Sequence, residues 1–445
     1  INNCDIFMTD METLSSQIIT PPPPESPGLP DTLSDVLSLD YIDGIDYTQY
    51  QERSQNHSLT STEQAVFEAF TKVYNLFSVK PKKNRKIDFA QARQSYFFLL
   101  QCLNPWKTPQ VLDTILKQTS REQQVLVTLE TISFLSRHWT QPIRPHLVRL
   151  IEHVTVVMGN LKASIQRQSQ ETMRDLLSSS GNSDLTPFIP VVLDSIASGH
   201  NIEEAVESLA GCVFVQNVEL PALSVIYPVL ENGLSAEKTE VRRKSCVILT
   251  NMTRLVEHPK EIVPLLNFLE PRLEKCVDMM SDPEAREVAE KTLALVRHTV
   301  KGRYVAPPTS SDILASLTQS YEKYASSGSL SVSTTTTDNF ALLSEYFSAM
   351  AESELYNESM WRSQFNYYLE ATLPAEQSEL SPMFDAFFQG YRSNNTTEET
   401  IFVDNEPGQD LYQGEFSLAY GSLTLLNNTH LHLKRNRFYG LLGPN

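Results

Sequence analysis

The sequence lacks any long apolar run. None of its stretches approaches the roughly 18 uninterrupted apolar residues that a transmembrane helix requires. It opens with Ile1-Asn2-Asn3-Cys4-Asp5, which has neither the basic nor the apolar part of a secretory signal peptide. These absences disfavour membrane-embedded and secreted proteins, so we expect a cytoplasmic protein with no membrane partner.

The sequence also lacks closely spaced pairs of cysteines. The five cysteines are scattered and none forms a C-x-x-C pair, so the sequence predicts neither a disulfide nor a metal site. We expect buried, reduced thiols at Cys212, Cys246 and Cys276, which fall on the apolar faces of predicted helices.

Positive charge is scarce, and the net charge is −18. Residues 1–60 hold ten acidic residues and one arginine, and residues 351–410 hold twelve acidic residues and two arginines. The body between these segments is therefore close to neutral. Local basic clusters on such a body can still bind phosphates, so the acidic total does not exclude an RNA partner.

The sequence also lacks the residues that would complete a phosphate-binding loop. It ends Gly440-Leu441-Leu442-Gly443-Pro444-Asn445, a predicted strand followed by what resembles the opening of a Walker A loop. The second glycine, the lysine and the hydroxyl of that loop are absent, so we expect this chain alone not to hydrolyse ATP. In isolation, a tight turn after a buried strand would look the same.

What precedes this end is a predicted antiparallel β subdomain. The alternating patterns of residues 415–420, 422–426 and 429–434 predict three short strands, with Asn427-Asn428 as a turn.

The rest of the chain is predicted to be mostly helical. Residues 1–60, rich in proline and acid, predict a disordered leader, in which residues 31–50 are either a partner-binding motif or simple linker. From residue 62 to 297, helices that begin near prolines (Pro145, Pro187, Pro221 and Pro264) alternate with partner helices. These partners, near residues 165, 203, 240 and 284, recur 38, 37 and 44 residues apart, the period of HEAT repeats.

Because one helix pair cannot bury its own apolar stripe, we expect neighbouring pairs to stack into a solenoid over residues 61–300. Four further helical stretches in residues 301–392 predict a four-helix bundle. An acidic linker (393–412) would then lead into a β-rich segment (413–445), the truncated start of an ATP-binding cassette.

Three parts of this sequence together resemble the fungal translation elongation factor 3 group, which are ABC-F ATPases with two cassettes. They are residues 206–215 with 225–230, residues 242–257 with 282–288, and residues 415–427 with 439–445. The order of solenoid, bundle and cassette is similar as well. The leader differs from the family, and residues 253–256 look closer to the ribosome-associated paralogue, which leaves the step of translation open.

The resemblance implies an N-terminal part of a ribosome-binding ATPase, which promotes release of exit-site tRNA or acts in termination and recycling. Its partners would be ribosomal RNA, ribosomal proteins and tRNA, without DNA. ATP and Mg²⁺ would be cofactors of the full-length protein but would not bind competently to this chain. By matching position, Tyr420 would stack on the adenine, and Gly443, Pro444 and Asn445 would start the phosphate loop.

Two basic clusters are candidates for RNA contact: Lys80, Lys82, Lys83, Arg85 and Lys86 in a predicted loop, and Arg242, Arg243 and Lys244 at a helix start. For the second cluster, solvation on the helix surface is an equally good interpretation. The alternative function is a non-enzymatic HEAT-repeat scaffold for protein partners. A transporter subunit is disfavoured by the large solenoid and the lack of membrane spans.

Overall fold

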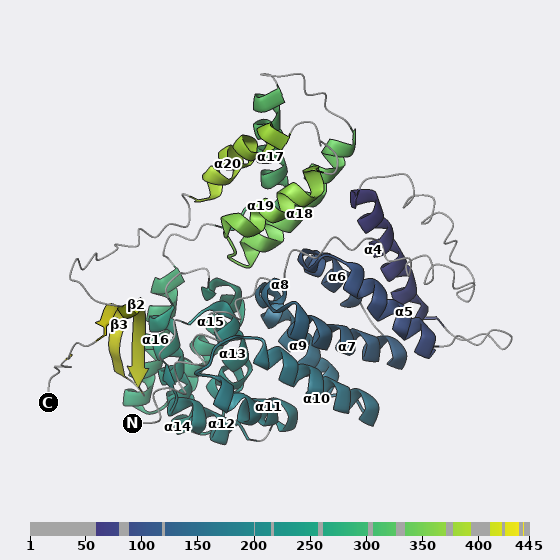
Figure 1. Ribbon diagram of the computed structural model, residues 1–445. Coiled ribbons are helices and arrows are strands. Elements are labelled where there is room, and N and C mark those ends of the chain that lie inside the picture. Colours follow the sequence, from purple (N-terminus) through teal and green to yellow (C-terminus); the bar gives the residue numbers. More distant parts are fainter. Residues whose placement is uncertain are drawn as a thin grey trace. The chain divides into compact units, whose positions relative to one another are not determined.

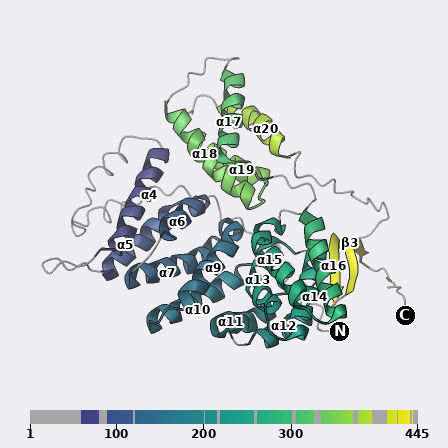
Figure 2. The same ribbon diagram turned by 180° about the vertical axis from the view of Figure 1, so that it is seen from behind.

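The structure is a computed structural model. It describes residues 59–79, 89–117, 121–199, 201–214, 218–256, 261–300, 306–325, 334–370, 377–392, 410–420, 423–435 and 439. The described chain is mostly helical, as predicted, with one small sheet near the C-terminal end (Figures 1 and 2). It divides into two compact units. Unit 1 comprises residues up to 107 with 309–347 and 356–395, and unit 2 comprises 108–308 with 348–355 and 396–445.

Unit 2 is built from helix pairs that follow one another along the chain (Figure 1). Its first helices are α9 (Leu147–Met158), α11 (Ile189–Ser198), α13 (Leu220–Leu234) and α15 (Val263–Met279). Their partners are α10 (Ala163–Ser178), α12 (Ile202–Ala210), α14 (Thr239–Leu255) and α16 (Pro283–Val300). The remaining elements of this part are α6 (Thr108–Ile115), α7 (Glu122–His138), α8 (Thr140–Ile143), and the 3-10 turns η2 (Arg144–His146) and η3 (Thr186–Phe188).

Proline marks the start of the first helices, as the sequence predicts. Pro221 and Pro264 lie in the first turn of α13 and α15. Pro145 and Pro187 lie in η2 and η3, which lead directly into α9 and α11. The first turn of a helix suits proline because the backbone N–H that proline lacks would have no partner there. Proline therefore fixes where each pair begins.

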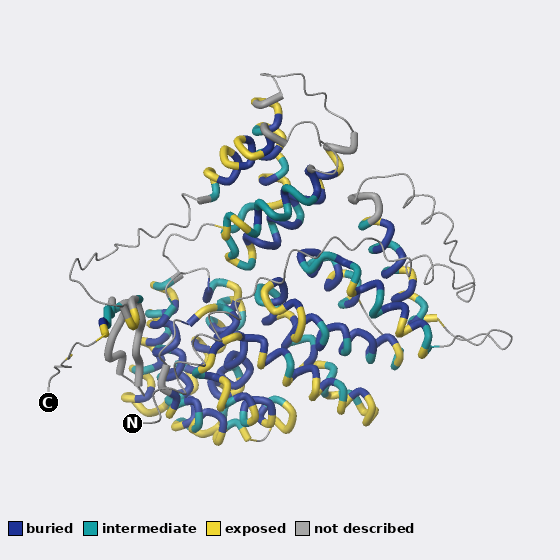
Figure 3. Tube along the Cα trace, viewed as in Figure 1, coloured by how far each residue is buried: buried dark blue, intermediate teal, exposed yellow. Residues whose placement is uncertain are grey.

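The pairs stack in two layers, in which like helices contact one another. Among the second helices, α12 contacts α14 and α14 contacts α16; among the first, α11 contacts α13 and α13 contacts α15. Leu249 and Met252 of α14 and Leu273 of α15 are fully buried by this stacking. Figure 3 shows the buried positions of unit 2 on the sides of the helices that face their neighbours. Each such side chain contributes roughly 1.5–3 kcal/mol by leaving water.

Unit 1 contains the predicted four-helix stretch, α17 (Ser310–Ala325), α18 (Thr334–Glu352), α19 (Glu358–Glu370) and α20 (Gln377–Arg392). Its core is aromatic. Trp361 of α19 is fully buried and stacks on Phe347 of α18, with ring centroids 4.5 Å apart, and Phe365 meets Phe384 of α20 at 5.1 Å. Offset or tilted ring pairs of this kind add stability beyond their buried area.

Unit 1 also contains two helices that the sequence analysis assigned to the solenoid, α4 (Leu59–Leu76) and α5 (Phe89–Cys102). Tyr346 and Tyr368, from α18 and α19, donate their hydroxyl hydrogens to the Glu63 carboxylate of α4, the second at 2.6 Å. The Lys107 ammonium, almost completely buried, lies over the Phe67 and Tyr346 rings and 3.9 Å from Glu345. These polar contacts attach α4, through Glu63, and the chain at Lys107 to the helices α18 and α19. The domain boundaries stay predictions.

The sheet corrects one prediction. Asn427 and Asn428 are not a turn but lie inside one strand, β3 (Leu423–Lys434), which pairs antiparallel with β2 (Asp410–Tyr420). The register shifts beside them, because Phe416 faces Thr429 whereas Leu418 faces Leu426. One extra residue on β3 makes this a β-bulge. Asparagine suits turns and bulges alike, because its side chain bonds to nearby backbone, so composition alone does not separate the two.

A third strand joins this sheet from the helical array. β1 (Val213–Phe214), which follows α12, pairs antiparallel with the end of β2, with Val213 opposite Tyr420 and Phe214 opposite Ala419. Helix α14 contacts both β2 and β3. Within unit 2 the sheet is therefore attached to the HEAT array by backbone pairing and by helix packing.

The cysteines are free in the described part of the chain, and Cys212, Cys246 and Cys276 are buried, as predicted. Cys212 differs in one respect, because it follows the end of α12 instead of lying on a helix face. Its thiol lies 3.6 Å from the Asp184 carbonyl oxygen.

Replacing Gly233 with alanine will test the close contact between α13 and α14. A Cβ added there would lie 2.3 Å from Ser245 Oγ and 3.1 Å from Val206 Cγ2. We expect G233A to lower the free energy of unfolding by about 1–3 kcal/mol, because the helices must move apart. Urea unfolding followed by circular dichroism measures the change.

G390A is the matched control, because a Cβ at Gly390 in α20 meets nothing within 4 Å. Alanine is the better helix former, so this variant should be unchanged or up to about 1 kcal/mol more stable. Equal stabilities of G233A and the unmodified chain would contradict the close approach.

A second prediction concerns acid. Burial, helped by the Arg149 charge, lowers the pKa of His146 from 6.5 to about 4, and burial also lowers the pKa of His153. Above pH 6.5 both imidazoles are neutral in the folded and unfolded chain. Between pH 6.5 and 4 the unfolded chain binds protons that the folded chain does not, so stability falls as the pH falls.

For His146 this loss should be on the order of 3 kcal/mol by pH 4. We expect H146Q to flatten the dependence of the unfolding free energy on pH across this window. An unchanged slope in that variant would show that His146 does not cause it.

Candidate nucleic-acid interface and hairpin site

Most of the residues predicted to form a site lie outside the described residues. These are Gly443, Pro444 and Asn445, and the basic loop residues Lys80, Lys82, Lys83, Arg85 and Lys86. Their roles stay predictions. Tyr420 ends β2, where its backbone pairs with Leu423 in the hairpin and with Val213 of β1. The backbone of Tyr420 thus lies between two strands, and the role of its ring stays a prediction.

Arg242 lies in the interior and does not face solvent. It is 5% exposed, and its guanidinium Nη1 donates to the carbonyl oxygens of Ala236 and Glu237, at 2.6 and 2.9 Å. Nη2 donates to Thr239 Oγ1 at 3.1 Å and to the Met279 carbonyl oxygen, at the end of α15, at 3.3 Å. This arginine therefore ties the turn before α14 to the C-terminal end of α15, and neither RNA contact nor surface solvation describes it.

The next two residues of α14 are paired across helices. Lys244 forms ion pairs with Glu207 of α12 and, at 3.7 Å, with Glu240 of its own helix. These acids raise the pKa of Lys244, mainly through the hydrogen bond to Glu207. Arg243 lies 3.9 Å from Glu284 of α16. Both side chains stay partly exposed, and their contact with RNA stays a prediction.

Similar ion pairs link neighbouring helices along the whole array. Further examples join the residue before α10 to α7, the residue before α14 to α12, α15 to α13, and α16 to α15: Lys162–Glu122 (2.8 Å), Lys238–Glu203 (2.5 Å), Arg272–Glu231 (2.9 Å) and Arg297–Glu270 (2.6 Å). Exposed pairs of this kind add little stability. They do neutralise much of the positive charge that could otherwise attract phosphate.

Two arginines on α10 are not neutralised in this way. Arg167 and Arg174 are exposed, and neither has an ion-pair partner among the described residues. They are seven residues apart, so they share one face of the helix and lie about 10 Å apart along it. Sequence reasoning missed them because they are isolated in the sequence and become neighbours only on the helix surface.

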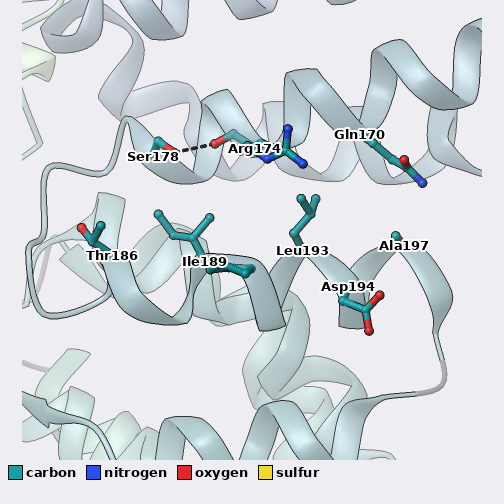
Figure 4. Close-up of a pocket in the computed structure, with 9 residues that line it drawn as sticks. Gln170, Arg174, Ser178, Thr186, Ile189, Leu193, Asp194 and Ala197 are labelled. Carbon is teal, nitrogen blue, oxygen red and sulfur yellow. Dashed lines mark hydrogen bonds between the residues drawn. The ribbon is translucent and has the colours of Figure 1, made fainter.

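Arg174 also lines a groove of about 540 Å³ between α10 and α11 (Figure 4). One wall carries polar side chains of α10, and the other carries mainly apolar side chains of η3 and α11. The lining residues are Gln170, Arg174, Ser178, Thr186, Ile189, Pro190, Leu193, Asp194 and Ala197. The groove thus places the Arg174 guanidinium and the Asp194 carboxylate near an aliphatic wall, so it offers both charged and apolar contacts.

No group of three or more His, Cys, Asp or Glu side chains is placed to hold a metal ion in the described part of the chain. None of the described helices combines the length and apolar character that crossing a bilayer requires.

Comparison with known proteins finds a family match within the helix array of unit 2. Residues 201–305, which contain α12 to α16, match the family described as the elongation factor 3/GNC1 HEAT repeat. The chain is 30% identical over 358 residues to elongation factor 3 of Zygosaccharomyces rouxii, an alignment that covers 78% of the chain and 33% of the relative. The chain is a relative of elongation factor 3.

Two further proteins of this group give alignments of similar identity and coverage. Elongation factor 3 of Candida albicans is 30% identical over 346 residues, with 76% of this chain and 32% of the relative covered. Elongation factor 3B of Saccharomyces cerevisiae is 29% identical over 337 residues, with 74% and 32% covered. The chain spans about a third of the length of these elongation factor 3 proteins. The buried Arg242 lies inside the matched HEAT segment.

Substitutions at neighbouring basic positions will separate structural from surface roles. R242M removes a buried charge and the donors to three backbone carbonyl oxygens, so we expect the free energy of unfolding to fall by about 2–4 kcal/mol. K244A removes only the partly exposed ion pairs with Glu207 and Glu240 and should change the free energy of unfolding little. Chemical denaturation of both variants measures the difference. Similar losses in the two would mean that Arg242 is not the structural residue described above.

Proposed function

We propose that this chain is the ribosome-docking part of an elongation factor 3-like ATPase that acts in translation in the cytoplasm. The observation that carries this proposal is the match to elongation factor 3 over more than three quarters of the chain, which includes the HEAT segment at residues 201–305. Its partners would be ribosomal RNA and ribosomal proteins, with tRNA as the element moved or released. The step would be exit-site tRNA release, or termination and recycling if it works as the paralogue does.

The proposal assigns the nucleotide to the C-terminal sheet. ATP with Mg²⁺ would bind the cassette that begins with β2 and β3, with its adenine on Tyr420 and its phosphates at Gly443, Pro444 and Asn445. The attachment of this sheet to the HEAT array supports such an arrangement, because β1 and α14 both touch it. A cassette that moves on nucleotide binding would then move against the array.

For RNA, the proposal favours Arg167 and Arg174 of α10. An arginine that lacks an internal carboxylate keeps its full charge for phosphate, and guanidinium groups bind phosphate through two parallel hydrogen bonds. Arg243 and Lys244, in contrast, must give up their glutamate partners before they bind RNA. The contact surface should therefore centre on α10.

A second candidate function is a scaffold for protein partners. The groove between α10 and α11 favours it, because its apolar wall of Ile189, Pro190 and Leu193 suits a peptide better than RNA. This candidate predicts no association with ribosomes under any condition.

Co-sedimentation with ribosomes tests the main proposal. We expect the chain to pellet with ribosomes at low salt and to be released as salt rises, because phosphate contacts displace counterions. R167A/R174A should bind more weakly and reduce the slope of log affinity against log salt by about 2.

K238A/K291A is the matched control, because it removes two exposed charges that are already paired with Glu203 and Glu287. It should bind as the unmodified chain does. Equal losses in both variants would refute the assignment to α10, and the absence of any co-sedimentation would refute ribosome docking.

A further inference from the structure

Two buried thiols face each other between consecutive helix pairs. Cys246 Sγ of α14 lies 4.0 Å from Cys276 Sγ of α15, and both residues are completely buried. The other described cysteines differ. Cys102 is half-buried on α5, and Cys212 is buried near the Asp184 carbonyl oxygen. Among the described cysteines, only Cys246 and Cys276 form a sulfur–sulfur contact.

A buried positive charge acts on this pair. Arg242 precedes Cys246 by one helical turn, and its guanidinium Nε is buried without a hydrogen-bond partner among the described residues. Its charge favours the thiolate form at both sulfurs. The pKa of Cys276 is lowered, chiefly by a hydrogen bond from Cys246, whose own pKa is raised. One sulfur thus becomes a nucleophile and the other its hydrogen-bond donor.

We propose that Cys246 and Cys276 form an oxidisable dithiol site that uses a hydroperoxide and closes to a disulfide between α14 and α15. The Cys276 thiolate attacks a peroxide oxygen, the O–O bond breaks, and a sulfenic acid and hydroxide form. The Cys246 thiol, deprotonated as it attacks, displaces water from the sulfenic sulfur and forms the S–S bond. Overall, two thiols and one hydrogen peroxide give one disulfide and two waters.

The burial of the pair determines how the site reacts. Hydrogen peroxide is small and uncharged, so it reaches the sulfurs during local opening of the array, and the reaction is slow. Once one sulfur is oxidised, the other is already beside it, and disulfide formation outruns further oxidation to sulfinic acid. The product joins consecutive helix pairs within the segment that matches the elongation factor 3 family. It restricts how these pairs move against each other.

Peptide mapping of the full chain after hydrogen peroxide treatment tests this proposal. Trypsin releases the two cysteines in separate peptides, residues 245–254 and 276–286. Without reductant we expect these peptides to be linked, with the loss of two hydrogen atoms, and reductant should separate them. The oxidised chain should show a higher Tm that reductant returns to its starting value.

The variants give sharp controls. C102S should form the link as the unmodified chain does, whereas C246S should leave Cys276 to proceed to sulfenic or sulfinic acid. Because the main measurement uses the unmodified chain, it stands even where C246S folds poorly. The proposal is overturned if Cys102 oxidises while residues 245–254 and 276–286 stay unlinked, or if Cys276 reaches sulfinic acid in the unmodified chain without forming the link.

Discussion

The structure of unit 2 depends on one constraint: no helix pair can cover its own apolar stripe. Leu249 and Met252 of α14 are buried because α12 and α16 lie on either side of that helix. Gly233 lets α13 and α14 approach so closely that Ser245 occupies the place of a side chain. Arg242 then fixes the turn before α14 to the end of α15. Apolar burial supplies the stability, Gly233 sets the spacing within one pair, and Arg242 links that pair to the next.

The stacking of the helices also determines which positive charges remain available to bind a partner. Helices brought side by side pair many of their lysines and arginines with carboxylates of the next helix, which leaves less positive charge for a partner. Arg167 and Arg174 are two of the exceptions, because neither has an ion-pair partner among the described residues, and Arg174 lines the groove beside α11. A nearly neutral array can thus still present a local basic surface, which explains how a chain of net charge −18 could approach RNA.

The sequence predicts the helix pairs well, because their signals are local. Pro221 and Pro264 mark helix starts because the backbone N–H that proline lacks would have no partner in the first turn. Apolar residues that recur with the helical period mark the face that will be buried. Contacts between residues far apart in the sequence cannot be predicted from such local signals. The bonding of Glu63 to Tyr346 and Tyr368 joins segments nearly 300 residues apart, and nothing near residue 63 indicates it.

The candidate site shows the same limit. Arg242, Arg243 and Lys244 read as one basic cluster, yet successive residues of a helix point about 100° apart, so one is buried and two are paired at the surface. Arg167 and Arg174 carry no local signal at all. The sequence predicts a turn at Asn427 and Asn428 where the structure has a bulge, because both structures favour the same residue type.

The most direct test of this account is a cryo-electron microscopy map of the chain bound to ribosomes. The account predicts density for the HEAT array on the ribosome, with the exposed face of α10 against ribosomal RNA and Arg167 and Arg174 at phosphate groups. A bound array whose α10 faces solvent, or contacts only protein, would contradict it.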